Sequence, residues 1–207
     1  MATKGNSIRT SIGPTILLGS GNFFDYDDPE NSRVTLSDFA YSLAFTTRFS
    51  GQCVSRRTGK RVFYSVAQHC EIMSRLVPES QAYAALMHES GETVCGDLNT
   101  PLKSKLSDYR QIEKRCSNAI MTAFGVVDVD HALIKAYDVR LWATERRDLM
   151  NWDGRRWAED DDAQPFDLEI VPLGPYDAAE SFLARFNQIA PRSIRDREST
   201  QTSLTRL

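Results

Sequence analysis

The sequence has few of the residues that mark membrane, metal-ribbon or duplex-binding proteins. Its four cysteines form no CxxC pair, which excludes a zinc ribbon and favours reduced thiols. No stretch approaches the roughly 18 apolar residues of a membrane span, and the polar start lacks the apolar segment of a secretion signal. The net charge of −3 provides no positive field for duplex nucleic acid. We therefore expect a cytoplasmic protein that binds neither membrane nor duplex nucleic acid.

The length and composition suit one domain. A chain of 207 residues with 41% hydrophobic residues can bury a sizeable core. We expect residues 1–190 to form this single domain. Residues 191–207 contain few apolar side chains, so we expect them to form a disordered tail.

Helical patterns occupy most of the chain, which predicts the all-α class. Thr35 and Asp38 have the spacing of a capping box and predict a helix that ends near Phe49. A glycine turn between two apolar stretches predicts a small β-hairpin over 50–64, near the N-terminal third. The remaining predicted helices cover 66–76, 81–92 with Ser80 as N-cap, 104–124, 131–151 with Asp130 as N-cap, and 176–189.

Two of only three histidines, His69 and His88, lie on adjacent predicted helices, and such a pair can ligate a transition metal. Glu89 adds a carboxylate, and Glu92 follows His88 by four residues on the same helix face. Asp97 lies in a Gly-containing loop that can turn back toward them. The alternative is that these are solvated charges and core histidines. Because the surrounding helices are otherwise apolar, we favour a metal site.

Several segments, in this order, resemble the HD-domain phosphohydrolases. They are Arg48–Gly51, Ser65–His69, Leu86–Glu89 with Glu92, Gly96–Lys103, and Tyr137–Glu145. The chain is most similar to the branch of small 5′-deoxynucleotidases and bacteriophage dATP triphosphohydrolases, over about residues 36–150. The resemblance implies an HD-domain helical bundle with the hairpin inserted, and a homo-oligomer. For a viral protein, the expected location is the host cytoplasm.

The resemblance also implies a set of metal ligands. The family pattern H…HD…D falls on His69, His88, Glu89 and Asp138, which would hold one divalent ion (Co, Mn, Zn or Mg). Glu89 departs from the pattern, because the family has Asp at this position. Its carboxylate lies one methylene further out, roughly 1.5 Å by standard carbon–carbon geometry, but it remains an oxygen donor.

By the same resemblance, Glu92 and Asp97 are the catalytic carboxylates that orient or deprotonate water and assist the leaving oxygen. Arg48 and Lys103 are expected to contact phosphate or sugar oxygens of the substrate. Phe49 could pack against the sugar or base, or lie in the core. Gln52 could recognise a base edge, although pairing within the hairpin is favoured.

The expected function is metal-dependent hydrolysis of deoxynucleotides. We favour a dNTP triphosphohydrolase of the dATP type, because the basic residues of the hairpin could meet a longer phosphate tail. Those residues are Arg56, Arg57, Lys60 and Arg61. The alternatives are a 5′-deoxynucleotidase acting on dNMPs, a non-catalytic nucleotide sensor, and an all-α interaction module whose histidines are incidental. Glu145, two turns beyond Asp138, is a candidate to support the site.

Overall fold

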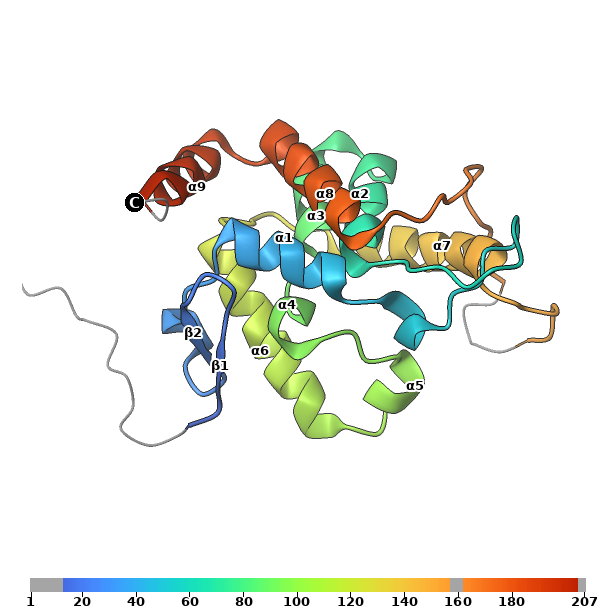
Figure 1. The fold of residues 1–207 in the computed structure, drawn as a ribbon, viewed down its shortest axis with the longest axis horizontal. Coiled ribbons are helices and arrows are strands. Elements are labelled where there is room, and N and C mark those ends of the chain that lie inside the picture. The colour runs from blue at the N-terminus through green and yellow to red at the C-terminus, as the bar shows by residue number, and fades with distance from the viewer. Residues whose placement is uncertain (1–12, 157–161, 205–207) are drawn as a thin grey trace, which may run out of the picture.

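The computed structural model describes residues 13–156 and 162–204, which are mostly helical and carry one small sheet (Figure 1). The all-α class is confirmed at this level. The longer helices are α1 (Leu36–Phe45), α2 (Val66–Leu76), α6 (Ser107–Ala123), α7 (His131–Leu149), α8 (Pro175–Ile189) and α9 (Arg192–Leu204). Among the described residues, none of the helices combines the length and apolar content needed to cross a bilayer.

The two-stranded sheet lies earlier in the chain than predicted. Strand β1 (Thr15–Leu17) pairs antiparallel with β2 (Phe23–Asp25), and Ile16 lies opposite the buried Phe24. The hairpin predicted for 50–64 is wrong as a ribbon, because this segment forms only an isolated bridge between Val54 and Arg61.

The end of α7 explains why the 50–64 segment forms one bridge and not a full ribbon. The N–H of Val54 donates to the carbonyl of Leu149 at 2.7 Å, and the N–H of Arg56 donates to the carbonyl of Asp148 at 2.8 Å. Part of the hydrogen-bonding capacity of this strand-like segment is thus used by the last turn of a distant helix.

The start of α1 is as predicted, and its end is not. Thr35 and Asp38 form the reciprocal capping box, so the helix begins where its first N–H groups find side-chain acceptors. It ends at Phe45, four residues before the expected Phe49, because Thr46 takes an extended conformation.

The helix predicted over 81–92 is divided by a turn. A 3-10 turn (Glu79–Gln81) contains Ser80, which is therefore not the N-cap, and leads into α3 (Ala82–Met87). A second short helix, α4 (Glu92–Cys95), follows the turn. Gly91 lies in that turn against α6, where an added Cβ would approach the carbonyl oxygen of Glu113 to 2.9 Å. Glycine permits this close approach of the turn to α6.

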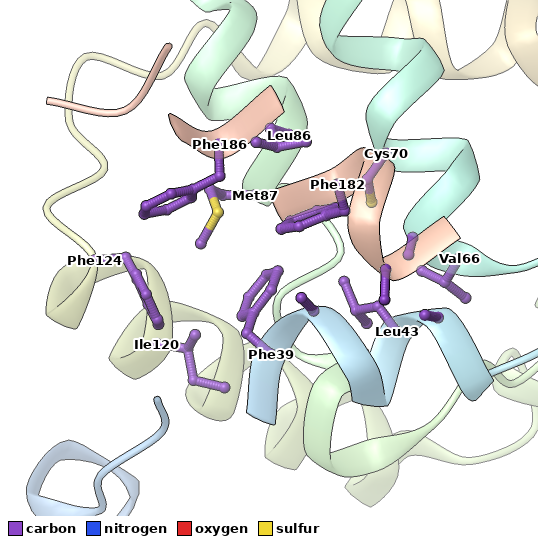
Figure 2. Packing of buried hydrophobic residues seen from close by; sticks show 14 of the residues in the cluster. Phe39, Leu43, Val66, Cys70, Leu86, Met87, Ile120, Phe124, Phe182 and Phe186 are labelled. Carbon is purple, nitrogen blue, oxygen red and sulfur yellow. The ribbon is translucent and has the colours of Figure 1, made fainter. Parts of the chain in front are cut away.

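The first core cluster joins α1, α2, α3, α6 and α8 (Figure 2). Phe39 of α1 lies at its centre, with ring centroids 5.5 Å from both Phe124 and Phe182. A second cluster packs α2 and α3 against α7 through residues such as Met73 and Leu141. Helix α2 belongs to both clusters and is mostly buried, which fixes the position of its polar residues.

A helix replaces most of the predicted disordered tail. Ile194 of α9 packs against the first core cluster close to Gly125, where no side chain stands in the way. Glu198 accepts a hydrogen bond from the N–H of Leu36 at 3.1 Å, satisfying one of the free donors at the start of α1. A few well-placed contacts thus order a segment of low average hydrophobicity. Short α5 (Thr100–Lys103) precedes α6, and residues 205–207 lie outside the described part of the chain.

Candidate metal centre

Four predicted ligands converge at one point. His69 comes from α2, His88 and Glu89 follow the end of α3, and Asp138 comes from α7. One donor atom from each residue lies within 4.8 Å of all the others. His69 is fully buried, and the other three are half-buried, so the group lies at the edge of the interior.

The orientation of the two imidazole rings favours metal binding. Nδ1 of His69 lies 2.6 Å from Glu145, and Nδ1 of His88 lies 2.7 Å from the carbonyl oxygen of Ala85. Each ring thus has its Nδ1 against an oxygen acceptor and presents Nε2 to the other ring, with the Nε2 atoms 3.3 Å apart. This is how protein carboxylates and carbonyls orient metal-ligating histidines.

The spacing of the donor atoms fits a small divalent ion. Nε2 of His69 lies 3.4 Å from Asp138, and Nε2 of His88 lies 3.5 Å from Glu89. Ligands held by bonds of ~2.1 Å in a tetrahedral arrangement are separated by ~3.4 Å. Two imidazole nitrogens and two carboxylate oxygens suit zinc, cobalt or manganese. The residues present therefore fit the metal that the sequence predicted.

The charges of the ligands follow from their surroundings. Burial lowers the pKa of His88, so this ring is neutral. Burial and Arg48 also act to lower the pKa of His69, but Glu145 and Asp138 outweigh them and raise it to about 9. The hydrogen bond and charge of His69 overcome burial and hold the pKa of Asp138 well below its usual range. A proton and a divalent ion therefore compete for Nε2 of His69.

Glu145 organises the residues behind the ligands. It is fully buried on α7 and accepts a hydrogen bond from Tyr64 at 2.8 Å and from Arg48 at 3.0 Å, besides its contact with His69. The spacing of Glu145 from Asp138 anticipated its supporting role. Tyr64 was missed in the sequence, where only its place just before a helix N-cap (Ser65) marked it.

The predicted catalytic carboxylates lie beside this centre. Glu92 begins α4 and is 4% exposed, and its Oε2 has no hydrogen-bond partner among the described residues. Burial, followed by the charges of Glu89 and Asp97, raises the pKa of Glu92 well above its usual value. Burial also raises the pKa of Asp97, against the opposing effect of Arg48. Both groups are thus shifted toward their protonated forms.

The predicted substrate contacts differ in their surroundings. Lys103 lies 2.7 Å from Glu113 and 4.0 Å from Glu92, which places a cation near a predicted catalytic carboxylate. Phe49 is half-buried and packs against the second core cluster. This agrees with the core position, one of the two positions predicted for it. Gln52 accepts a hydrogen bond from Arg61 at 3.1 Å within its own loop.

Arg48 is nearly buried, and its guanidinium is already paired with carboxylates of the protein. Its side chain is 11% exposed, and it is paired with Glu145 at 3.0 Å and with Glu89 at 3.7 Å. The structure thus brings Arg48 against Glu89, one of the four candidate metal ligands.

Similarity to known proteins assigns the chain to a family. No protein-family model matches it. It is 36% identical over 172 residues to the uncharacterized protein YfdR of Escherichia coli K12, which covers 83% of this chain and 93% of YfdR. The chain belongs to the YfdR family. An uncharacterized protein of Rhodobacter capsulatus is 36% identical to it over 124 residues, 56% of this chain and 61% of that protein.

The alignment with YfdR spans more than four fifths of both chains, so the similarity extends over most of each protein. The name YfdR carries no statement of activity. The function of this member of the YfdR family is therefore argued from the chemistry of its candidate metal centre.

Proposed function

We propose that this protein is a metal-dependent phosphohydrolase of deoxynucleotides, with an HD-type site. The observation that carries the proposal is the convergence of four metal ligands next to Glu92, a buried carboxyl group with a raised pKa. Buried acids of this kind, close to a charged centre, are typical of catalytic sites. The favoured reaction releases a deoxynucleoside and triphosphate from a dNTP of the dATP type.

When bound, the ion would supply Lewis acidity toward a phosphate oxygen and lower the pKa of a water molecule. Asp97 accepts a proton from the attacking water as the new bond to phosphorus forms. Its raised pKa makes it a better base than an ordinary aspartate. Glu92 delivers its proton to the 5′ oxygen as the bond between phosphorus and that oxygen breaks. One water is thus consumed, and passage of the proton from Asp97 to Glu92 restores both carboxyl groups for the next turnover.

The charges around the centre support an anionic substrate. Lys103 is half-buried beside Glu92, where its ammonium can meet phosphate oxygens. The exposed cations of the 56–61 loop belong to the same chain segment as Arg48 and favour a substrate with a longer phosphate tail. The main alternative is a 5′-deoxynucleotidase, which would break the bond between phosphorus and the 5′ oxygen in a dNMP. Its single phosphate would need only Lys103.

The deciding experiment is a nucleotide panel. Each dNTP and dNMP is incubated with the protein and Co²⁺, Mn²⁺, Mg²⁺ or Zn²⁺, and the products are resolved. Deoxynucleoside with triphosphate supports the favoured reaction, and deoxynucleoside with phosphate from dNMPs supports the nucleotidase. Binding without turnover with any metal would refute the enzyme.

Glu89 motivates a second candidate, a nucleotide sensor that binds without hydrolysis, because it replaces the expected aspartate in the ligand set.

A third candidate is an interaction module whose histidines are incidental. Metal analysis of purified wild type and His69→Ala tests it: equally low metal content in both would favour the module, and metal lost only in the variant would exclude it.

A further inference from the structure

Arg48 is buried among carboxylates that belong to the metal centre. Its guanidinium contacts Glu145, which is 0% exposed, and approaches Glu89, a predicted ligand. A buried arginine needs partners that compensate its charge, and these two carboxylates provide them. By contrast, Lys103 is 23% exposed and contacts none of the four ligands in the structure. The guanidinium is therefore already engaged in holding protein groups.

Glu145 connects Arg48 to a second ligand. One of its oxygens lies 2.6 Å from Nδ1 of His69, and the other accepts the hydrogen bond from Arg48. A continuous path thus runs from His69 through Glu145 and Arg48 to Glu89. Its two ends are ligands on different elements, α2 and the turn after α3. Partners of this kind fix the ring orientation and basicity of a ligating histidine.

The backbone holds this path in place. The N–H of Arg48 donates to the carbonyl of Tyr64 at 2.9 Å, and the Tyr64 hydroxyl in turn donates to Glu145. After Arg48 the chain takes left-handed conformations at Phe49 (φ 53°), Ser50 (φ 51°) and Gly51 (φ 73°). Each of the first two costs ~1 kcal/mol or more for a residue with a side chain. Backbone strain that is retained beside a site suggests a functional role, here for the placement of Arg48 against the candidate ligands.

We propose that Arg48 and Glu145 are positioning residues that set the affinity of the metal centre by orienting Glu89 and His69. Arg48 then acts on the ligands, and the phosphate contact predicted from the sequence falls to other cations. The inference rests on the metal centre of the proposed function and deepens it.

The test measures Co²⁺ binding to metal-stripped protein at one pH, by the visible absorption of the bound ion. Arg48→Met and Glu145→Gln are each expected to weaken binding ~10- to 100-fold, the usual scale for partners behind a metal ligand, and to change the spectrum. Lys103→Met is the matched control, a nearby cation without a contact to a ligand, and should not weaken binding. Wild-type affinity and spectrum in Arg48→Met, with a raised KM for nucleotide, would overturn the proposal.

Each single variant removes one partner of the buried Arg48–Glu145 ion pair and could unfold for that reason. The double variant Arg48→Met/Glu145→Gln removes both charges, and thermal denaturation checks its folding. It should fold and still bind Co²⁺ more weakly than wild type; wild-type affinity would overturn the proposal. If wild type binds Co²⁺ and the variants lose affinity while no nucleotide is hydrolysed, the positioning role stands and the proposed function fails.

Discussion

Replacing Glu92 by glutamine separates its proposed catalytic role from the cost of burying its charge. Glutamine keeps the shape of the side chain and removes the proton that the carboxyl group delivers to the leaving oxygen. Losing a general acid or base costs ~100-fold or more in turnover. Metal content should not change, because Glu92 is not one of the four residues whose donor atoms cluster within 4.8 Å. The expected result is at least a ~100-fold lower kcat with full metal occupancy.

The same change should make the fold more stable. Burial raises the folded-state pKa of Glu92, so the folded protein loses stability relative to the unfolded chain as the pH rises above the ordinary value of 4.5. Glutamine has no charge to bury, so the melting temperature of the variant should exceed that of wild type at pH 8. At pH 4 the difference should shrink, because Glu92 is then protonated in both states.

The assays are steady-state hydrolysis, metal analysis and thermal denaturation at the two pH values. Glu113→Gln is the matched control. Glu113 lies on α6 and, like Glu92, is a carboxylate close to Lys103, at a distance of 2.7 Å. It should affect turnover far less. Loss of metal together with activity in Glu92→Gln would reassign Glu92 as a ligand and refute the reasoning, and unchanged turnover would remove it from the catalytic machinery.

Three further outcomes are expected. Glu89→Asp should retain or raise activity if the ligand set tolerates a carboxylate on either side-chain length. Activity and metal content are measured together. Inactivation would mean that the site depends on the longer side chain and on its contact with Arg48 at 3.7 Å. Co²⁺ affinity should rise ~tenfold per pH unit up to about 9, because the ion displaces the proton on His69; titrations between pH 6 and 9 that show no slope would contradict this. Glu198→Ala should cost ~1 kcal/mol of unfolding free energy in urea, because the N–H of Leu36 loses its acceptor; an unchanged midpoint would show that α9 does not support α1.

Local sequence patterns predicted the features that depend on neighbours in the chain. The capping box at Thr35 and the span of α2 are confirmed, because hydrophobic period and cap chemistry act within a few residues. The clustering of His69, His88 and Glu89 followed from their positions on adjacent helices. Asp138 came from the resemblance alone, and the structure places it in the same cluster.

Features made by distant contacts could not be predicted in this way. Arg48 and Glu145 are 97 positions apart, so no local pattern shows that they pair. The same applies to α9, whose contact with Leu36 spans 162 positions, and to the 50–64 segment, whose partner is the end of α7. The expected homo-oligomer stays a prediction that measurement of the molecular mass in solution can check.

The four candidate metal ligands come from parts of the chain that fold as different elements, and this has a consequence for how the protein unfolds. An ion shared by His69 and Asp138 would close a long chain loop between α2 and α7, much as a disulfide does. Because it binds only the folded arrangement, an ion at 100 times its dissociation constant would add ~2.7 kcal/mol to the free energy of unfolding. A chelator would then release α7 from α2 first, and hydrogen exchange in α7 should accelerate before that in α1.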